Sequence, residues 1–146
     1  VLVEVNSETD FVAKTDDFQQ LVRDIAMHIA AAEPRYVRRE EVTAEILEHE
    51  REIFRQQAAE TGKPANVIEK IVEGKIEKFY GEACLLEQPF VKNPDLTVGQ
   101  MVNEAVGRIG ENIQVRRFTR DKLGEGIERK DVDFAAEVMA AAGQAG

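Results

Sequence analysis

Two neighbouring segments with heptad-like apolar spacing constrain the fold of this chain most strongly. Segments 43–61 and 67–79 each carry an apolar stripe of the kind that packs one helix on another. The stripe residues are Ile46, Leu47, Ile53, Phe54, Val67, Ile68, Ile71, Val72, Ile76 and Phe79. Gly62 suits the C terminus of the first helix, and Pro64 suits the first turn of the second. Helices joined by so short a turn run antiparallel, so the sequence predicts a helical hairpin.

The outer faces of this predicted hairpin are charged. Glutamates alternate there with Arg and Lys, as on a solvated helical surface with some ion pairs: Glu45, Glu48, Glu52, Glu69, Glu73 and Glu77. The narrow apolar stripe is expected to be mostly buried between the two helices of the hairpin. A second copy of the chain is an alternative partner for it.

The segments on either side of the hairpin predict a small core. Residues 1–5 alternate apolar and polar as in a half-buried strand, and residues 17–31 carry one apolar face behind a cap at Thr15. A Thr97–Gln100 capping box opens a helix that Gly110 closes. Residues 113–118 alternate again, placing Ile113, Val115 and Arg117 on one face and Gln114, Arg116 and Phe118 on the other. Residues 85–91 are expected to be extended or at a sheet edge because Pro89 interrupts them.

The predicted fold class is therefore α+β: a small antiparallel sheet packed with helices, from which the helical hairpin protrudes. The expected organisation is core over residues 1–40, hairpin over 41–82, core again over 83–123, and a C-terminal module over 124–146. A flexible link at Leu123–Gly126 precedes a short final helix over residues 131–142. The apolar face of that helix, including Phe134 and Val138, packs either on the core or on a partner.

Charge and cysteine content narrow the classes of partner and compartment. The 146 residues carry a net charge of −9, which disfavours direct nucleic-acid or membrane binding because these polyanions attract basic patches. A protein partner is favoured instead. The single cysteine, Cys84, cannot form an internal disulfide and fits a reducing compartment. No apolar run reaches membrane-spanning length.

Catalytic interpretations find little support in the sequence. His28 and His49 are far apart, and the sequence around His49 lacks the second histidine that would complete a helical zinc site. Each histidine is expected to be structural or on the surface. Cys84 lies among apolar residues, as a buried inert thiol would. The glycines near Gly107 and Gly124 are too sparse for a phosphate loop. We expect no enzymatic activity, no metal, no cofactor and no bound nucleotide.

Phe11 is the residue whose role the local pattern leaves open. It follows the polar turn Asn6–Asp10, whose residues favour turns and helix caps. A large aromatic side chain in that position either folds back into the core or is held out for a partner.

The segment around Phe11, EVNSETDFVAK (Glu4–Lys14), resembles the signature of the elongation factor Ts family. Five further blocks resemble the same family in the same order: Asp24–Val37, Gly62–Phe79, Leu85–Gln100, Ile109–Arg117 and Gly124–Ala140. Members of that family normally begin with a small helical domain and a hairpin strand ahead of this signature. The chain opens at Val1 without an initiator Met, so we expect a fragment that comprises the core, the dimerisation region and the C-terminal module.

The resemblance implies a translation elongation factor that binds elongation factor Tu and promotes release of its GDP. It assigns partner contacts to Thr9, Asp10, Phe11 and Val12, and to Phe134, Glu137 and Val138 near the C terminus. It also implies a bacterial cytoplasmic location, or the matrix or stroma of an organelle of bacterial descent. A homodimer, formed through the sheet around residues 113–118 or through the hairpin, is a further expectation. The alternative function is a non-catalytic interaction or dimerisation module that keeps the fold without exchange activity.

Overall fold

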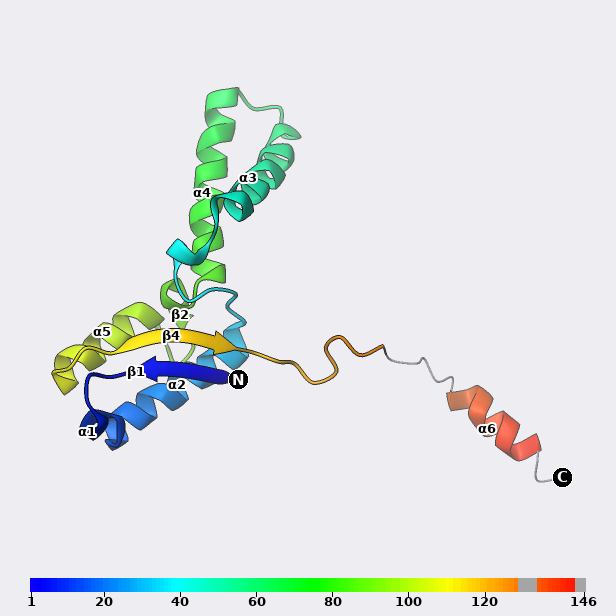
Figure 1. Cartoon of the computed structure of the whole chain (residues 1–146). Helices are drawn as coiled ribbons and strands as arrows, with labels where there is room; N and C mark the ends of the chain where they lie inside the picture. Colours follow the sequence, from blue (N-terminus) through cyan, green and yellow to red (C-terminus); the bar gives the residue numbers. More distant parts are fainter. Residues whose placement is uncertain (129–133, 144–146) are drawn as a thin grey trace.

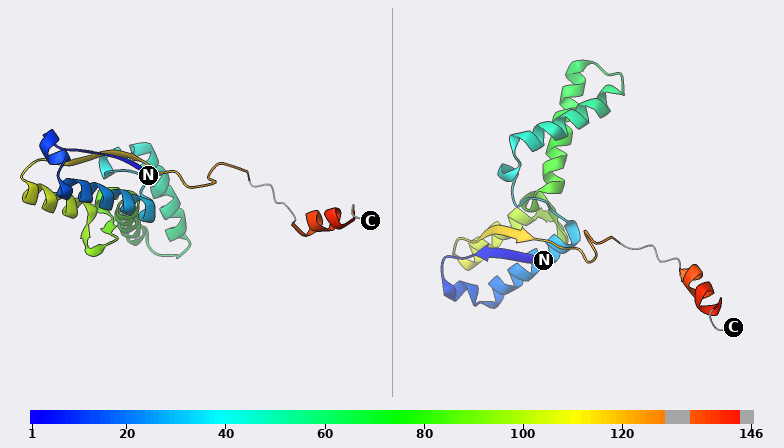
Figure 2. Two further views of the ribbon diagram at one scale, coloured as in Figure 1. Left: turned by 90° about the horizontal axis from the view of Figure 1, so that it is seen from below. Right: turned by 45° about the vertical axis from the view of Figure 1, so that its right-hand side comes forward.

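A computed structural model describes residues 1–128 and 134–143 of the chain. The body combines a two-stranded sheet with helices, and a long helical hairpin rises from it (Figure 1). The predicted α+β class and the protruding hairpin are both confirmed. Figure 2 shows that the sheet lies on one side of a layer of helices.

The sheet pairs β1 (Leu2–Asn6) with β4 (Gln114–Thr119) in antiparallel orientation, as the sequence predicted. The register joins Glu4 to Arg117 but Val5 to Val115, which leaves Arg116 as an extra residue in a β-bulge. The predicted strict alternation of β4 is therefore wrong beyond Val115. Arg116 and Arg117 are both exposed, and Phe118 turns back to pack against the core.

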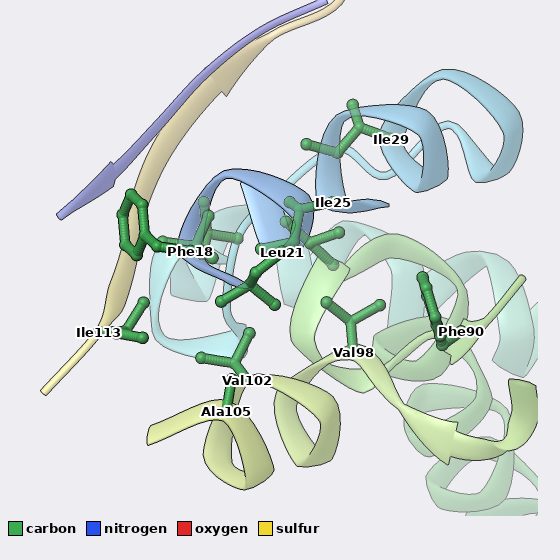
Figure 3. Packing of buried hydrophobic residues seen from close by; sticks show 12 residues of the cluster. Phe18, Leu21, Ile25, Ile29, Phe90, Val98, Val102, Ala105 and Ile113 are labelled. Carbon is green, nitrogen blue, oxygen red and sulfur yellow. The ribbon is translucent and has the colours of Figure 1, made fainter. Parts of the chain in front are cut away.

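The main core lies between this sheet and two helices, α2 (Asp16–Ala32) and α5 (Val98–Ile109). Figure 3 shows Phe18 of α2 near Ile113, the residue before β4, and Leu21 of α2 near Val102 of α5. Threonine side chains cap both helices: Thr15 accepts from the amide of Phe18, and Thr97 forms the predicted capping box with Gln100. These apolar faces are the ones that the helical periodicity predicted.

The hairpin consists of α3 (Ala44–Ala59) and α4 (Ala65–Ala83). Gly62 takes a positive φ of 70° in the turn, and Pro64 immediately precedes α4 instead of lying in its first turn. Val72, Ile76 and Phe79 are buried along the α3–α4 contact and at its base. Ion pairs cross between the helices, with N–O distances of 2.5 Å for Arg51–Glu73 and 3.2 Å for Arg55–Glu69. The charged faces of the hairpin therefore carry ion pairs, as the sequence predicted.

The predicted extended segment 85–91 is only partly correct. Leu85–Glu87 forms a 3-10 turn (η2), and Pro89–Phe90 (β2) pairs antiparallel with Asn93–Thr97 (β3) in a second small sheet. A further 3-10 turn, η1 (Arg39–Glu41), leads into the hairpin. A strand of two residues is too short to show the period of two that reveals strands in a sequence.

A buried polar pair fastens this second sheet to the helices. The imidazole of His28 in α2 is fully buried, with Nε2 2.9 Å from Oε1 of Gln88 and Nδ1 accepting from the amide of Val91 at 3.2 Å. The proton of the neutral ring is therefore on Nε2. The Gln88 amide donates to the carbonyls of Glu82 at 2.7 Å and Ala32 at 3.3 Å. His28 thus has the structural role that was one of the two expected.

Burial lowers the pKa of His28 from its ordinary value of 6.5, because the charged ring would be desolvated. The unfolded chain therefore binds more protons than the folded protein just below pH 6.5, and the free energy of unfolding falls as the pH drops through that region.

We predict that His28 makes the free energy of unfolding fall by up to about 1.4 kcal/mol per pH unit below about pH 6.5. Urea unfolding between pH 8 and pH 5 measures this slope. The variant His28→Gln should flatten it, whereas His49→Gln, at an exposed position, should leave it unchanged. Equal slopes in the wild type and His28→Gln would contradict the assignment.

Candidate partner-binding site

Phe11 lies in a helical turn of four residues, α1 (Asp10–Ala13), between β1 and α2. Thr9 caps its start by accepting from the amide of Val12 at 3.4 Å. The hydroxyl of Thr15 donates to the carbonyl of Val12 at 2.7 Å and accepts from the amide of Phe18 at 3.3 Å. Side-chain hydrogen bonds from threonine therefore hold both ends of a turn that is too short to be stable alone.

A carboxylate from a distant part of the chain also holds this turn. Glu111 accepts the amide of Thr9 on Oε1 at 3.1 Å and the hydroxyl of Thr9 on Oε2 at 2.8 Å, across 102 residues of sequence. Glu111 follows Gly110, which ends α5 with a positive φ of 83°. Sequence reasoning missed Glu111, because a contact between residues so far apart leaves no local pattern.

The side chain of Phe11 points away from the core. It is 84% exposed, whereas its neighbour Val12 packs against the main core cluster. Asp10 is exposed as well. The alternative that Phe11 folds back into the core is therefore wrong: the turn buries Val12 and leaves the aromatic ring in solvent.

An open hollow of about 290 Å³ borders this turn. It is lined by Ala13 from α1 and by Phe18, Gln19, Val22 and Arg23 from α2. The hollow adjoins the turn that carries Phe11, so an apolar side chain of a partner can enter it when the partner contacts this turn.

The C-terminal candidates lie apart from Phe11. Helix α6 (Phe134–Gly143) is separate from the body, beyond the end of the sheet opposite to α1 (Figures 1 and 2). Phe134 is 76% and Val138 51% exposed, and Glu137 is exposed too. Of the two alternatives for this helix, packing on the core is wrong. Residues 131–133 of the predicted helix lie outside the described part of the chain.

The link before α6 contains local turns. Two overlapping turns are closed by hydrogen bonds from the amide of Glu125 to the carbonyl of Lys122 at 3.0 Å and from that of Ile127 to Gly124 at 3.3 Å. Gly124 and Gly126 both take positive φ values in these turns.

The groups available for catalysis are few. Cys84 is buried, and burial raises the pKa of its thiol to about 11, so it carries little thiolate near neutral pH. Within residues 1–128 and 134–143, no three His, Cys, Asp or Glu side chains gather closely enough to hold a metal ion. The helices in those residues are too short or too polar to cross a membrane. The surface around Phe11 is therefore the strongest candidate site.

We predict that Phe11→Ala lowers the free energy of unfolding by less than about 1 kcal/mol, because the ring is in solvent. Phe18→Ala, seven positions later in the buried core, should cost about 3–5 kcal/mol. Urea unfolding of both variants measures the difference. Similar losses in the two variants would contradict the outward orientation of Phe11.

Comparison with known proteins shows which family the chain belongs to. A family model described as Elongation factor TS matches residues 19–125. Elongation factor Ts of Geobacter sulfurreducens is 68% identical over 143 residues, which cover 98% of this chain and 66% of that protein. Elongation factor Ts of Carboxydothermus hydrogenoformans is 64% identical over 141 residues, 97% of this chain and 65% of that protein. The matched region thus spans slightly less than two thirds of these relatives, and the chain belongs to the elongation factor Ts family.

Proposed function

We propose that this chain binds elongation factor Tu and promotes the release of its GDP. The observation that carries the proposal is the exposed ring of Phe11, presented on a turn that hydrogen bonds from Thr9, Thr15 and Glu111 hold in place. A phenyl ring that is 84% exposed contributes little to the stability of the free protein. The ring is therefore available for contact with a partner.

An exchange factor of this kind makes and breaks no covalent bond. It binds the nucleotide-free partner more tightly than the nucleotide-bound partner, and linkage then requires that it weaken nucleotide binding by the same factor. The proposed contact is the ring of Phe11 inserted between helices of the nucleotide-binding domain, with Asp10 beside it. Insertion shifts the elements that order the phosphates and Mg²⁺.

The size of the ring limits how much of this shift Phe11 supplies. Burying a phenyl side chain contributes about 1.5–3 kcal/mol, or roughly 10- to 150-fold in an equilibrium constant. Additional contacts must therefore hold the two proteins together. We propose the hollow lined by Phe18 and Val22 as one of them.

The exposed face of α6 is the second proposed contact. Phe134 and Val138 provide apolar area, and Glu137 lies between them in the sequence. This helix lies beyond the end of the sheet opposite to α1 (Figure 1), so its proposed contact with the partner is separate from that of Phe11. Two contacts on one chain raise the affinity above that of either alone.

The second candidate function is an interaction or dimerisation module without exchange activity. The protruding α3–α4 hairpin favours it, since much of its surface is free to meet another chain (Figure 1). Homodimerisation through this hairpin or through the sheet stays a prediction. The exchange assay separates the two functions, because a simple module would bind without speeding nucleotide release.

We predict that the chain speeds release of fluorescent GDP from elongation factor Tu and that Phe11→Ala slows the catalysed release by roughly tenfold or more, reflecting the lost burial. Met27→Ala is the matched control, because it removes an exposed apolar side chain from α2, outside the turn that carries Phe11. Catalysed release by Phe11→Ala at the wild-type rate would remove Phe11 from the mechanism.

A further inference from the structure

We infer that Glu111 is a positioning residue for Phe11: its carboxylate clamps Thr9 and so sets the conformation in which the turn presents the ring. For the effect on nucleotide release, this inference rests on the function proposed above. For the geometry of the turn it stands independently.

Both oxygens of the Glu111 carboxylate accept hydrogen bonds from Thr9. The amide of Thr9 donates to Oε1 at 3.1 Å, and its hydroxyl donates to Oε2 at 2.8 Å. Hydrogen bonds to a charged acceptor are stronger than neutral ones, and a two-point contact fixes orientation as well as distance. Thr9 is therefore held in both its backbone and its side chain.

The clamp acts directly at the start of α1. The hydroxyl of Thr9, while donating to Glu111, also accepts from the amide of Val12, so the same oxygen links the carboxylate to the cap of the turn. Glu111 also places a negative charge next to the N terminus of the turn, where exposed amides favour it. Phe11 is two residues from this cap, and the direction of its Cα–Cβ bond follows from the conformation there.

Glu111 itself is presented from a well-anchored loop. The amide of Gly110 donates to the carbonyl of Val106 at 2.8 Å in the αL end of α5. Ile113, two residues after Glu111, is buried in the main core. The carboxylate thus relates the Phe11 turn to the packed α5–β4 segment.

The Glu111–Thr9 clamp lies at the surface, and this location distinguishes a positioning role for Glu111 from a role in global stability. Its hydrogen bonds lie at the surface, where such bonds contribute little to global stability. Removing the carboxylate should loosen the turn while leaving the core intact. An effect on nucleotide release should then vanish when Phe11 is already absent.

The first measurement is amide exchange by NMR in the free protein. Glu111→Ala should raise the exchange rates of Thr9 and Val12 by roughly tenfold or more, with Val115 in the core unaffected. Glu73→Ala, which removes an ion pair with Arg51 in the hairpin, is the control and should change none of these rates. Unchanged exchange at Thr9 and Val12 in Glu111→Ala would overturn the inference.

The second measurement is a double-mutant cycle on GDP release from elongation factor Tu. Glu111→Ala alone should slow catalysed release about three- to tenfold, whereas adding it to Phe11→Ala should slow release no further. A wild-type rate of GDP release with Glu111→Ala alone would overturn the positioning role. The same holds if adding Glu111→Ala to Phe11→Ala slows release by a further factor. If the wild-type chain does not speed release, the proposed function fails, and the amide-exchange result still decides whether Glu111 orders the turn.

Discussion

The antiparallel pairing of β1 with β4 is the interaction on which the rest of the structure depends. It joins Leu2 to Thr119 at one end and Asn6 to Gln114 at the other, so it closes the core over α2 and α5. The same pairing carries the turn after β1 next to the loop before β4, which is why Thr9 meets Glu111. Presentation of Phe11 is thus a consequence of the sheet register.

The hairpin is attached to this core by a short stretch of paired backbone. The amides of Arg35 and Tyr36 donate to the carbonyl of Ala83 at 2.8 and 3.0 Å, and the amide of Leu85 donates to the carbonyl of Tyr36 at 2.8 Å. The chain therefore enters and leaves the hairpin side by side. The base has its own apolar cluster, built around Phe79 and Val42, so α3 and α4 extend from the body without disturbing the main core.

Features with a strong local pattern could be predicted from the sequence. Heptad spacing indicated the α3–α4 hairpin, and the Thr97–Gln100 box marked the start of α5 to the residue. The bulge at Arg116 could not be predicted, because it depends on pairing with Glu4 and Val5 in another strand. The β2–β3 sheet was missed because β2 has only two residues.

The candidate site was predictable only in part, because it too depends on contacts between residues far apart in the sequence. Resemblance directed attention to Phe11, but the local pattern allowed the ring to be inside or outside. The outward orientation results from Val12 occupying the core side of the turn. Thr9 was expected to contact the partner, and the structure adds that its amide and hydroxyl bind Glu111. That contact depends on tertiary structure and leaves no trace in a single sequence.

The role proposed for Phe11 can be measured as the affinity of this chain for nucleotide-free and for GDP-bound elongation factor Tu. Titration calorimetry on both forms, with the wild type and with Phe11→Ala, gives the ratio of the two dissociation constants. We expect the wild type to favour the nucleotide-free form strongly and Phe11→Ala to reduce this preference by roughly tenfold or more. An unchanged preference in Phe11→Ala would show that the exposed ring does not couple binding of this chain to loss of nucleotide.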